Sequence, residues 1–558
     1  MTAFLGKTAE PRICVALLLH NHMPPLMGRD PRKSRGQVVA VMPWARYHGV
    51  QAHYFMAELI ERVAEESGGE RLNMNLTQTL VQQIQAYARG TRRDLFEDMS
   101  RKDPRHLSDE DRSFIFRNLL MRNRLADESL RYVEIRSKIE NGQALSDKEI
   151  FDLQVLSPFI WFPPLIRDSD AALYKLYKKG RCFNLSDKHE VFSRMNHYME
   201  QIIPRWRRLQ EHGLVELSTS PYSHAIVPIL CDSNVIKESA PYSPLPDQRY
   251  CYPEDAEDQI NAAVEGHQQT FGRKPEGMWP SEGAICNDMV PPLEKAGIRW
   301  IASGQQNLLN SLNRTRRTRP SDWPLAGYEL YSPWMIRYQG SSVCGVFRDR
   351  GMSDDISFRY KNWDANDAVN DFMNNCRNIA AGLERNPGNL GGRPGLIFIA
   401  LDGDNFQEYY PRNGQLFIEM LFSRLAKGED GIVMTTVSEY LTAYGCPDGN
   451  ELTDLWPGSW IDGSLATWTK SQASKKAWEY LAKARSMLAH CPPRRRKVAM
   501  EYLRRAQCSC WFWWYGGDYF SLQALEYDRL FRGNLIQFYR TLKLNPPDYL
   551  FVPLIGNN

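Results

Sequence analysis

Leu396-Ile-Phe-Ile-Ala-Leu-Asp-Gly-Asp-Asn-Phe-Gln-Glu-Tyr-Tyr-Pro411 is an apolar run that passes directly into acidic and aromatic residues. Its apolar part, Leu396 to Leu401, is typical of a strand that is buried on both faces of a parallel sheet. Three carboxylates follow, at Asp402, Asp404 and Glu408. Carboxylates at the carboxyl end of such a strand can transfer protons, and the neighbouring tyrosines can stack on sugars. The alternative interpretation is a turn that Asp402 caps and the next glycine permits.

Strands of this buried type alternate with amphipathic helices between residues 13 and 402, and polar residues gather where the strands end. The alternation predicts an α/β fold, a parallel barrel whose site lies on its carboxyl face. The charge-rich segment from about 91 to 210 predicts a helical insertion, and the alternation over 326–360 predicts a β-hairpin insertion. The predicted domains are a barrel over residues 1–425 and a helical domain over residues 426–558.

The composition is typical of a soluble globular protein, with 43% hydrophobic and 24% charged residues in a chain of 558. The net charge of +3 is small for this length and argues against nucleic acid as a partner. No apolar run reaches the length of a membrane span, and Ile13 to Leu19 is interpreted as a strand, not as a secretion signal. We therefore expect a cytoplasmic protein without a membrane partner.

The eleven cysteines are irregularly spaced, and Cys508 and Cys510 are the only close neighbours. One Cys-x-Cys pair without a second pair is a weak zinc signal. His20 and His22, after the first predicted strand, share a face if the strand continues. They could bind a sugar hydroxyl or a metal, but histidines that shape a loop through hydrogen bonds are favoured over metal ligands.

Glu282 follows a short predicted strand and lies on a Pro/Gly turn close to Trp279. An acidic residue presented in this way is a candidate nucleophile or acid. The alternative, an N-cap region for the next helix, leaves Trp279 unexplained. Upstream, Glu216 lies inside a predicted strand, where a carboxylate needs a partner, and Tyr222 and His224 follow the end of that strand.

The chain resembles glycoside hydrolase family 57, and especially its amylopullulanase-like α-amylase branch. The resemblance covers nearly the whole length, and Phe347-Arg-Asp349 and Gly458-Ser-Trp460 also look like that branch. Five ordered segments carry it: His22-Met-Pro24, the run from Gly213 to Leu230, Gly277-Met-Trp-Pro-Ser-Glu-Gly283, Leu401-Asp-Gly-Asp-Asn405 and Ala506-Gln-Cys-Ser-Cys-Trp-Phe-Trp-Trp-Tyr-Gly516.

The resemblance implies a (β/α)7 barrel followed by a helical bundle that closes over the cleft. It implies retaining chemistry on the α-glucosidic bonds of an α-glucan or oligosaccharide, with no metal or cofactor required. In that chemistry Glu282 is the nucleophile and Asp402 the acid/base. A retaining pair is expected to stand about 5–5.5 Å apart, and the like charge of Asp404 should raise the pKa of Asp402.

The resemblance also suggests residues that hold the sugar or stack on it. For any one aromatic residue among them, packing in the core is an equally good interpretation. The candidates for substrate binding are His20, His22, Glu216, Tyr222, His224, Trp279, Arg348, Asp349, Asp404, Tyr410, Trp460, Cys510, Trp511 and Trp513.

Three departures from the family pattern fall at expected sugar-binding positions. Met23 replaces the usual Gln, Asp404 is one methylene shorter than the usual Glu, and Cys510 replaces an Asp expected to bind the sugar. A thiol is a much weaker hydrogen-bond acceptor than a carboxylate. These changes leave two hypotheses open: an enzyme with shifted specificity, or a glucan-binding protein whose catalysis has decayed. A metal-dependent deacetylase or mannosidase is a third, but no Asp-His-His ligand set supports it.

Overall fold

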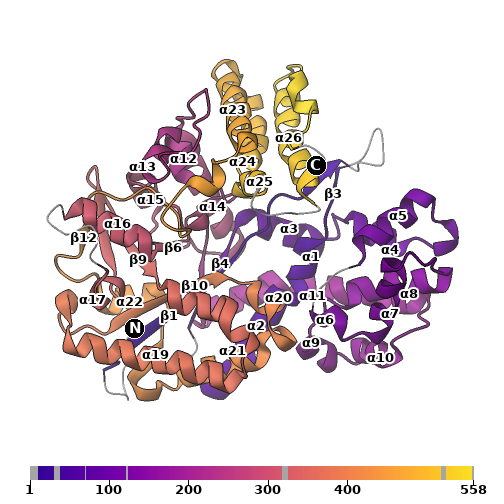
Figure 1. Ribbon diagram of the computed structural model, residues 1–558, viewed down its shortest axis with the longest axis horizontal. Coiled ribbons are helices and arrows are strands. Elements are labelled where there is room, and N and C mark those ends of the chain that lie inside the picture. The colour runs from indigo at the N-terminus through magenta and orange to yellow at the C-terminus, as the bar shows by residue number, and fades with distance from the viewer. Residues whose placement is uncertain are drawn as a thin grey trace.

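The computed structural model describes residues 10–29, 38–68, 71–120, 124–316, 324–516 and 523–555. A ring of parallel strands forms its centre (Figure 1). Around the ring the order is β5, β4, β1, β10, β9, β7, β6. Their bounds are β1 (Ile13–Asn21), β4 (Leu72–Leu76), β5 (Val215–Ser218), β6 (Gly277–Met278), β7 (Trp300–Gly304), β9 (Ser341–Arg348) and β10 (Gly395–Asp402).

The ring is closed between β5 and β6 by a single parallel bridge, which joins Thr219 to Met278. Beside it, the Trp279 amide donates to the Thr219 carbonyl at 2.9 Å. Only a few backbone hydrogen bonds therefore complete the barrel at this seam. The expectation of a (β/α)7 barrel is confirmed.

Strands β1 and β10 show why the apolar runs form a barrel. They are paired in parallel, with Cys14 opposite Leu396 and His20 opposite Asp402. Alternate residues, such as Ala16 and Ala400, pack in one cluster with residues of β7 and β9 across the barrel, while their neighbours pack in the larger core outside. Because side chains alternate along a strand, His20 and Asp402 continue the inward-facing row at the carboxyl end of the barrel.

Helices surround the ring, and their apolar faces explain their position. Helix α19 is capped by the Asp364 side chain and buries residues at intervals of three and four, from Ala368 to Leu383, as a helix against a core should. The helices of this layer are α2 (Phe55–Ser67), α3 (Gln78–Ala88), α11 (Leu185–Glu211), α14 (Pro253–Phe271), α15 (Val290–Ala296), α16 (Gln305–Thr315), α19 (Ala365–Arg385) and α21 (Gln415–Ala426).

The predicted helical insertion forms a separate lobe, at the right of Figure 1. It contains α4 (Leu95–Arg101), α5 (Asp109–Asn118), α6 (Arg124–Asp127), α7 (Leu130–Glu140), α8 (Asp147–Phe159), α9 (Pro164–Ser169) and α10 (Ala171–Lys179). A fully buried ion pair, Arg46 Nε to Asp94 Oδ2 at 2.8 Å, ties the start of this lobe to α1 (Trp44–His48). Helix α11 then returns the chain to the barrel, where it packs on α3 and β5.

Two expectations about the sheet differ from the structure. The hairpin is present, because β8 (Trp334–Tyr338) pairs antiparallel with β9, but β9 is itself a barrel strand and not part of an insertion. The short strand β11 (Ile432–Met434) pairs with the start of β1, so the sheet continues past the domain boundary expected at residue 425. The outlying β12 (Glu451–Leu452) pairs with β8.

The C-terminal helices stand over the carboxyl end of the barrel, in yellow and orange at the top of Figure 1. They are α23 (Gln472–Ser486), α24 (Pro493–Ala506), α25 (Ser509–Tyr515) and α26 (Ala524–Thr541). Ala225, after β5, forms an antiparallel bridge with Cys508, and Ser223 Oγ donates to the Arg504 carbonyl at 2.6 Å. Within the described ranges, none of the helices combines the length and the apolarity needed to cross a bilayer.

Candidate active site

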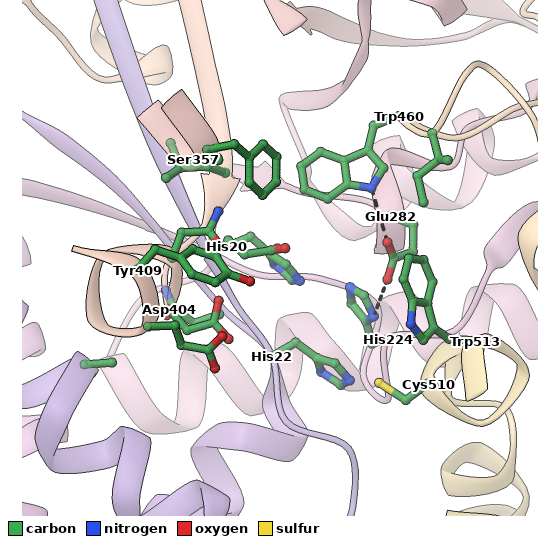
Figure 2. Close-up of a pocket in the computed structure, with 18 of the residues that line it drawn as sticks. His20, His22, His224, Glu282, Ser357, Asp404, Tyr409, Trp460, Cys510 and Trp513 are labelled. Atoms are coloured by element: carbon green, nitrogen blue, oxygen red, sulfur yellow. Dashed lines mark hydrogen bonds and ion pairs between the residues drawn. The ribbon is translucent and has the colours of Figure 1, made fainter. Parts of the chain in front are cut away.

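A pocket of about 750 Å³ lies between the carboxyl ends of the barrel strands and helix α25. We call it the central pocket, and Figure 2 shows its walls. Side chains from β1, β9, β10 and α25 and from the segments after β5 and β6 meet there. The candidates that line it are His20, His22, His224, Glu282, Arg348, Asp402, Asp404, Trp460, Cys510 and Trp513.

Glu282 enters the pocket from a strained turn that follows β6. Its backbone has φ 58° and ψ 26°, a left-handed conformation that side chains other than glycine and asparagine rarely adopt. The Trp460 amide donates to the Glu282 carbonyl at 3.0 Å, and the Trp460 indole Nε1 donates to carboxylate Oε2 at 3.2 Å. Burial raises the pKa of Glu282 to about 7, and the indole hydrogen bond opposes the rise.

Asp402 ends β10 in a tight approach to β1. The Gly403 amide donates to the His20 carbonyl at 2.7 Å, and a Cβ on Gly403 would lie 2.4 Å from Asn21 Oδ1. A larger residue at this position would therefore have to displace the Asn21 side chain. The pKa of Asp402 is raised well above its usual value by burial first, and then by the charges of Asp404 and Glu282.

Arg348 is the cation that partly offsets these charges. Its Nε donates to the Ala400 carbonyl at 2.6 Å and its terminal nitrogen to Asp354 at 2.6 Å. The guanidinium also lies over the Trp460 ring, 5.0 Å from the ring centre. Arg348 is thus held by contacts with β10, with Asp354 and with the Trp460 ring.

Three histidine rings form one wall of the pocket. His224 lies almost parallel to His20 and to His22, with ring centres 4.8 Å and 4.1 Å away. Each Nδ1 atom has a fixed partner: Asn75 at 2.7 Å for His20, Thr77 at 3.1 Å for His22 and Ser509 at 2.8 Å for His224.

These rings are neutral. Burial lowers the pKa of His20 to about 4, and burial together with the neighbouring rings lowers the pKa values of His22 and His224 well below the usual 6.5. His224 Nδ1 lies 3.7 Å from Glu282 Oε1, and since the ring is uncharged this contact positions the carboxylate without forming an ion pair. His224 Nε2 is buried and has no hydrogen-bond partner among the described residues.

The opposite side of the pocket is acidic, and beside Glu408 it contains residues that the sequence did not single out. Burial and then the charge of Asp404 raise the pKa of Glu408 to about 7. His48 and His53 also line the pocket. His48 directly precedes a π-helical segment, Gly49–Tyr54, and His53 lies within that segment. A second π-helix, Asp355–Arg359, supplies Ser357 and Phe358. A π-helix shifts which residues share a face, and apolar periodicity carries no signal for it.

Six candidates lie outside the central pocket, and three of them are polar groups with partners elsewhere. Glu216 accepts from the Trp300 indole at 2.7 Å and from the Ser438 hydroxyl at 2.6 Å, which is the partner that a carboxylate in a strand requires. The Tyr222 hydroxyl donates to Gln82 at 3.0 Å. Asp349 caps the short helix α18 (Arg350–Asp354) by accepting from the Met352 amide.

The other three are aromatic residues, and all three are buried. Trp279 is fully buried and meets Trp460 edge to face, with ring centres 5.1 Å apart. The Tyr410 hydroxyl donates to the Ile356 carbonyl at 2.5 Å, and the Trp511 indole donates to the Arg505 carbonyl at 2.8 Å. None of these rings lines the central pocket.

Solved structures share this architecture at low sequence identity. A branching enzyme from Thermococcus kodakaraensis is similar over 95% of this chain and 90% of its own, with a TM-score of 0.58 and 15% identity. The α-amylase AmyC from Thermotoga maritima is similar over 96% and 93%, with a TM-score of 0.56 and 13% identity. A 4-α-glucanotransferase from Thermococcus litoralis is similar over 95% of this chain and 60% of its own, with a TM-score of 0.53 and 13% identity. At these identities the likeness shows the fold.

No curated protein matches the sequence. The model of one protein family does match, from residue 16 to residue 448, which includes all of the strand ring except the first three residues of β1, and both carboxylates. By this match the chain belongs to glycosyl hydrolase family 57.

Proposed function

We propose that the protein is a retaining glycoside hydrolase or transglycosidase that acts on an α-glucan, with Glu282 as the nucleophile and Asp402 as the acid/base. The observation that carries this proposal is that both carboxylates face one pocket and have different surroundings. Asp402 has three negative neighbours and a pKa well above its usual value, whereas Glu282 accepts a hydrogen bond that favours its charged form. Such a difference separates an acid from a nucleophile.

The reaction then proceeds in two displacements. Asp402 gives its proton to the glycosidic oxygen while Glu282 attacks the anomeric carbon, so a glycosyl ester forms on Glu282. Asp402, now a carboxylate, takes a proton from water or from a sugar hydroxyl, whose oxygen attacks the ester carbon and releases Glu282. Trp460 donates to one oxygen of Glu282, and the His224 ring lies 3.7 Å from the other, so the carboxylate is aimed chiefly by the indole hydrogen bond.

The neutral histidines and the tryptophans support a sugar as the substrate. The buried and unpartnered Nε2 of His224 offers a hydrogen bond to a ligand hydroxyl. Trp460 and Trp513 line the pocket and can stack on pyranose rings. The names of the solved relatives, a branching enzyme, an α-amylase and a 4-α-glucanotransferase, favour an α-glucan. We propose the amylopullulanase-like branch, with action on α-1,4 and also α-1,6 bonds.

The test compares purified wild type with Glu282→Gln on amylose, pullulan and glycogen. We expect the wild type to release reducing ends or to transfer chains, with the product formed first in the α configuration, and Glu282→Gln to be inactive. Equal, zero turnover by both proteins would refute the enzyme assignment. Glucan binding by both proteins without turnover would instead support the glucan-binding alternative, which Met23, Asp404 and Cys510 motivate.

A further inference from the structure

One edge of the central pocket brings together the side chains of His22, Cys508 and Cys510. His22 comes from the end of β1, and the two cysteines from the junction of α24 and α25. One ligand atom from each of the three, an imidazole nitrogen and two sulfurs, lies within 4.8 Å of the other two. Figure 2 shows the Cys510 sulfur beside the His22 ring.

The spacing suits a tetrahedral metal ion. Zinc bonds of about 2.3 Å to sulfur and about 2.0–2.1 Å to nitrogen place ligand atoms about 3.5–3.8 Å apart. His22 Nε2 and Cys508 Sγ are already 3.7 Å apart. The two separations that involve Cys510 Sγ are within 4.8 Å, and rotation of this side chain, which is partly exposed on the pocket wall, is what would shorten them.

The histidine is held in the orientation that a metal ligand needs. His22 Nδ1 shares a hydrogen bond with Thr77 Oγ1 at 3.1 Å, which directs Nε2 towards Cys508. A hydrogen bond to the far nitrogen is the usual support of a metal-binding imidazole, because it fixes the tautomer and the ring plane. The ring is also neutral, so its Nε2 lone pair is available.

We propose that His22, Cys508 and Cys510 bind one Zn²⁺ ion, with the fourth coordination position open to the central pocket. Two sulfurs and one imidazole select zinc over magnesium or calcium, and three protein ligands with an open position are a known zinc arrangement. On binding, each thiol releases its proton to the buffer and the sulfur coordinates as a thiolate. The Cys508-x-Cys510 pair, a weak signal alone, thus gains its third ligand from the opposite end of the chain.

Zinc is expected to inhibit glycoside cleavage, and this consequence rests on the proposed function. Cys510 and Glu282 line the same pocket, so the ion and its water would occupy space that a sugar needs beside the nucleophile. Zinc binding itself does not depend on catalysis and is measured separately. A protein that binds zinc but cleaves no glucan would therefore refute the function and leave the metal site intact.

The binding test uses the full chain, stripped by a chelator and kept reduced by a phosphine. Titration with Zn²⁺ alone, followed by calorimetry and metal analysis, should give one ion per chain. Co²⁺ should produce a sulfur-to-cobalt charge-transfer band and the visible bands of a tetrahedral site. Cys508→Ser and Cys510→Ser should each weaken zinc binding by at least about 10-fold and abolish the charge-transfer band or reduce it.

Cys446→Ser is the matched control. Cys446 and Cys344 form another thiol pair, with sulfurs 3.0 Å apart, but they do not belong to a three-ligand cluster among the described residues. This variant should still bind one zinc ion. Less than one ion per wild-type chain would overturn the proposal, as would unchanged affinity in Cys510→Ser. Because Cys510 is only partly buried, its variant decides the question if Cys508→Ser fails to fold.

Discussion

At the scale of single residues, the two carboxylates of the central pocket should give opposite limbs to the dependence of activity on pH. Glu282 must be ionised to attack, and its pKa is raised to about 7, so kcat/KM should rise as the pH increases through about 7. Asp402 must be protonated, so activity should fall again at higher pH as that proton is lost. The measurement is a profile of kcat/KM on a soluble maltooligosaccharide.

Trp460→Phe sharpens this prediction. The indole hydrogen bond favours the ionised form of Glu282, so its removal should move the acidic limb to higher pH. An unchanged acidic limb would show that another group controls it. Phenylalanine keeps an aromatic ring in the pocket and removes only the indole N–H. A shifted acidic limb therefore reports the lost hydrogen bond to Glu282, not a change in substrate binding.

The buried Asp402 carboxylate should lower the stability of the folded protein at alkaline pH. Its folded-state pKa is raised above the unfolded value of about 3.9. The folded state therefore holds the proton more tightly, and stability falls as the pH rises from the unfolded pKa to the folded one. Asp402→Asn does not titrate, so at about pH 8 it should be more stable than wild type, and this difference should shrink as the pH falls.

The measurement is chemical unfolding of both proteins at acidic and alkaline pH. The gain of Asp402→Asn should be large at alkaline pH and vanish near pH 4, whereas Asp448→Asn, at an exposed position, should show no gain. A gain that is independent of pH would contradict the argument, because only the charged form of Asp402 is penalised by burial.

At the scale of elements, the close contact between the ends of β10 and β1 can be tested by adding one methyl group at Gly403. Gly403→Ala would place a Cβ 2.4 Å from the Asn21 side chain, which is itself buried and bonded to the Leu19 carbonyl. The Asn21 side chain must move, and because Asn21 lies between His20 and His22 in the chain, we expect activity to fall by about 10-fold or more. Stability should fall by about 1–3 kcal/mol.

Gly382→Ala is the matched control for this change. Gly382 lies inside α19, and a Cβ there would meet no atom within 4 Å. Alanine should stabilise that helix by about 0.5–1 kcal/mol and leave kcat unaltered. Equal activity losses in the two variants would mean that the strand ends do not position the site.

The elements also show what the sequence could and could not predict. The inward row of β1 and β10 follows from apolar runs that end at His20 and Asp402, so the barrel and the position of Asp402 at its carboxyl end were predictable. Glu216 is different: its type and its strand suggested a site, but alternation along a strand does not say which end of a barrel a side chain serves. The π-helices that carry His53 and Phe358 into the pocket depend on tertiary packing, which local patterns do not encode.

At the scale of the whole molecule, the helical lobe is joined to the barrel through a buried charge pair. Arg46 contacts Asp94 through two nitrogens, at 2.8 Å and 3.0 Å, and Asp94 also caps α4. Arg46→Met would leave Asp94 buried without its cation, so we expect a loss of about 3–5 kcal/mol. Thermal or urea unfolding measures this loss.

The matched control is Arg337→Met. Arg337 pairs with Glu451 at 2.9 Å, but both side chains are about half exposed, and such pairs contribute about 1 kcal/mol or less. Similar losses in the two variants would show that the ion pair beside the lobe is no more important than one on the surface.

The central pocket is built from residues far apart in the chain, and this affects when it forms during protein synthesis. His22 and Cys508, which meet at its edge, are 486 positions apart. At about 5–20 residues per second, a ribosome needs roughly 25–100 s to pass from one to the other. Trp460 and Ser509, which hold Glu282 and His224, also emerge late. A nascent chain that has completed its strand ring therefore still lacks part of its pocket, and we expect it to gain that pocket only after Cys508 and Ser509 have left the ribosome.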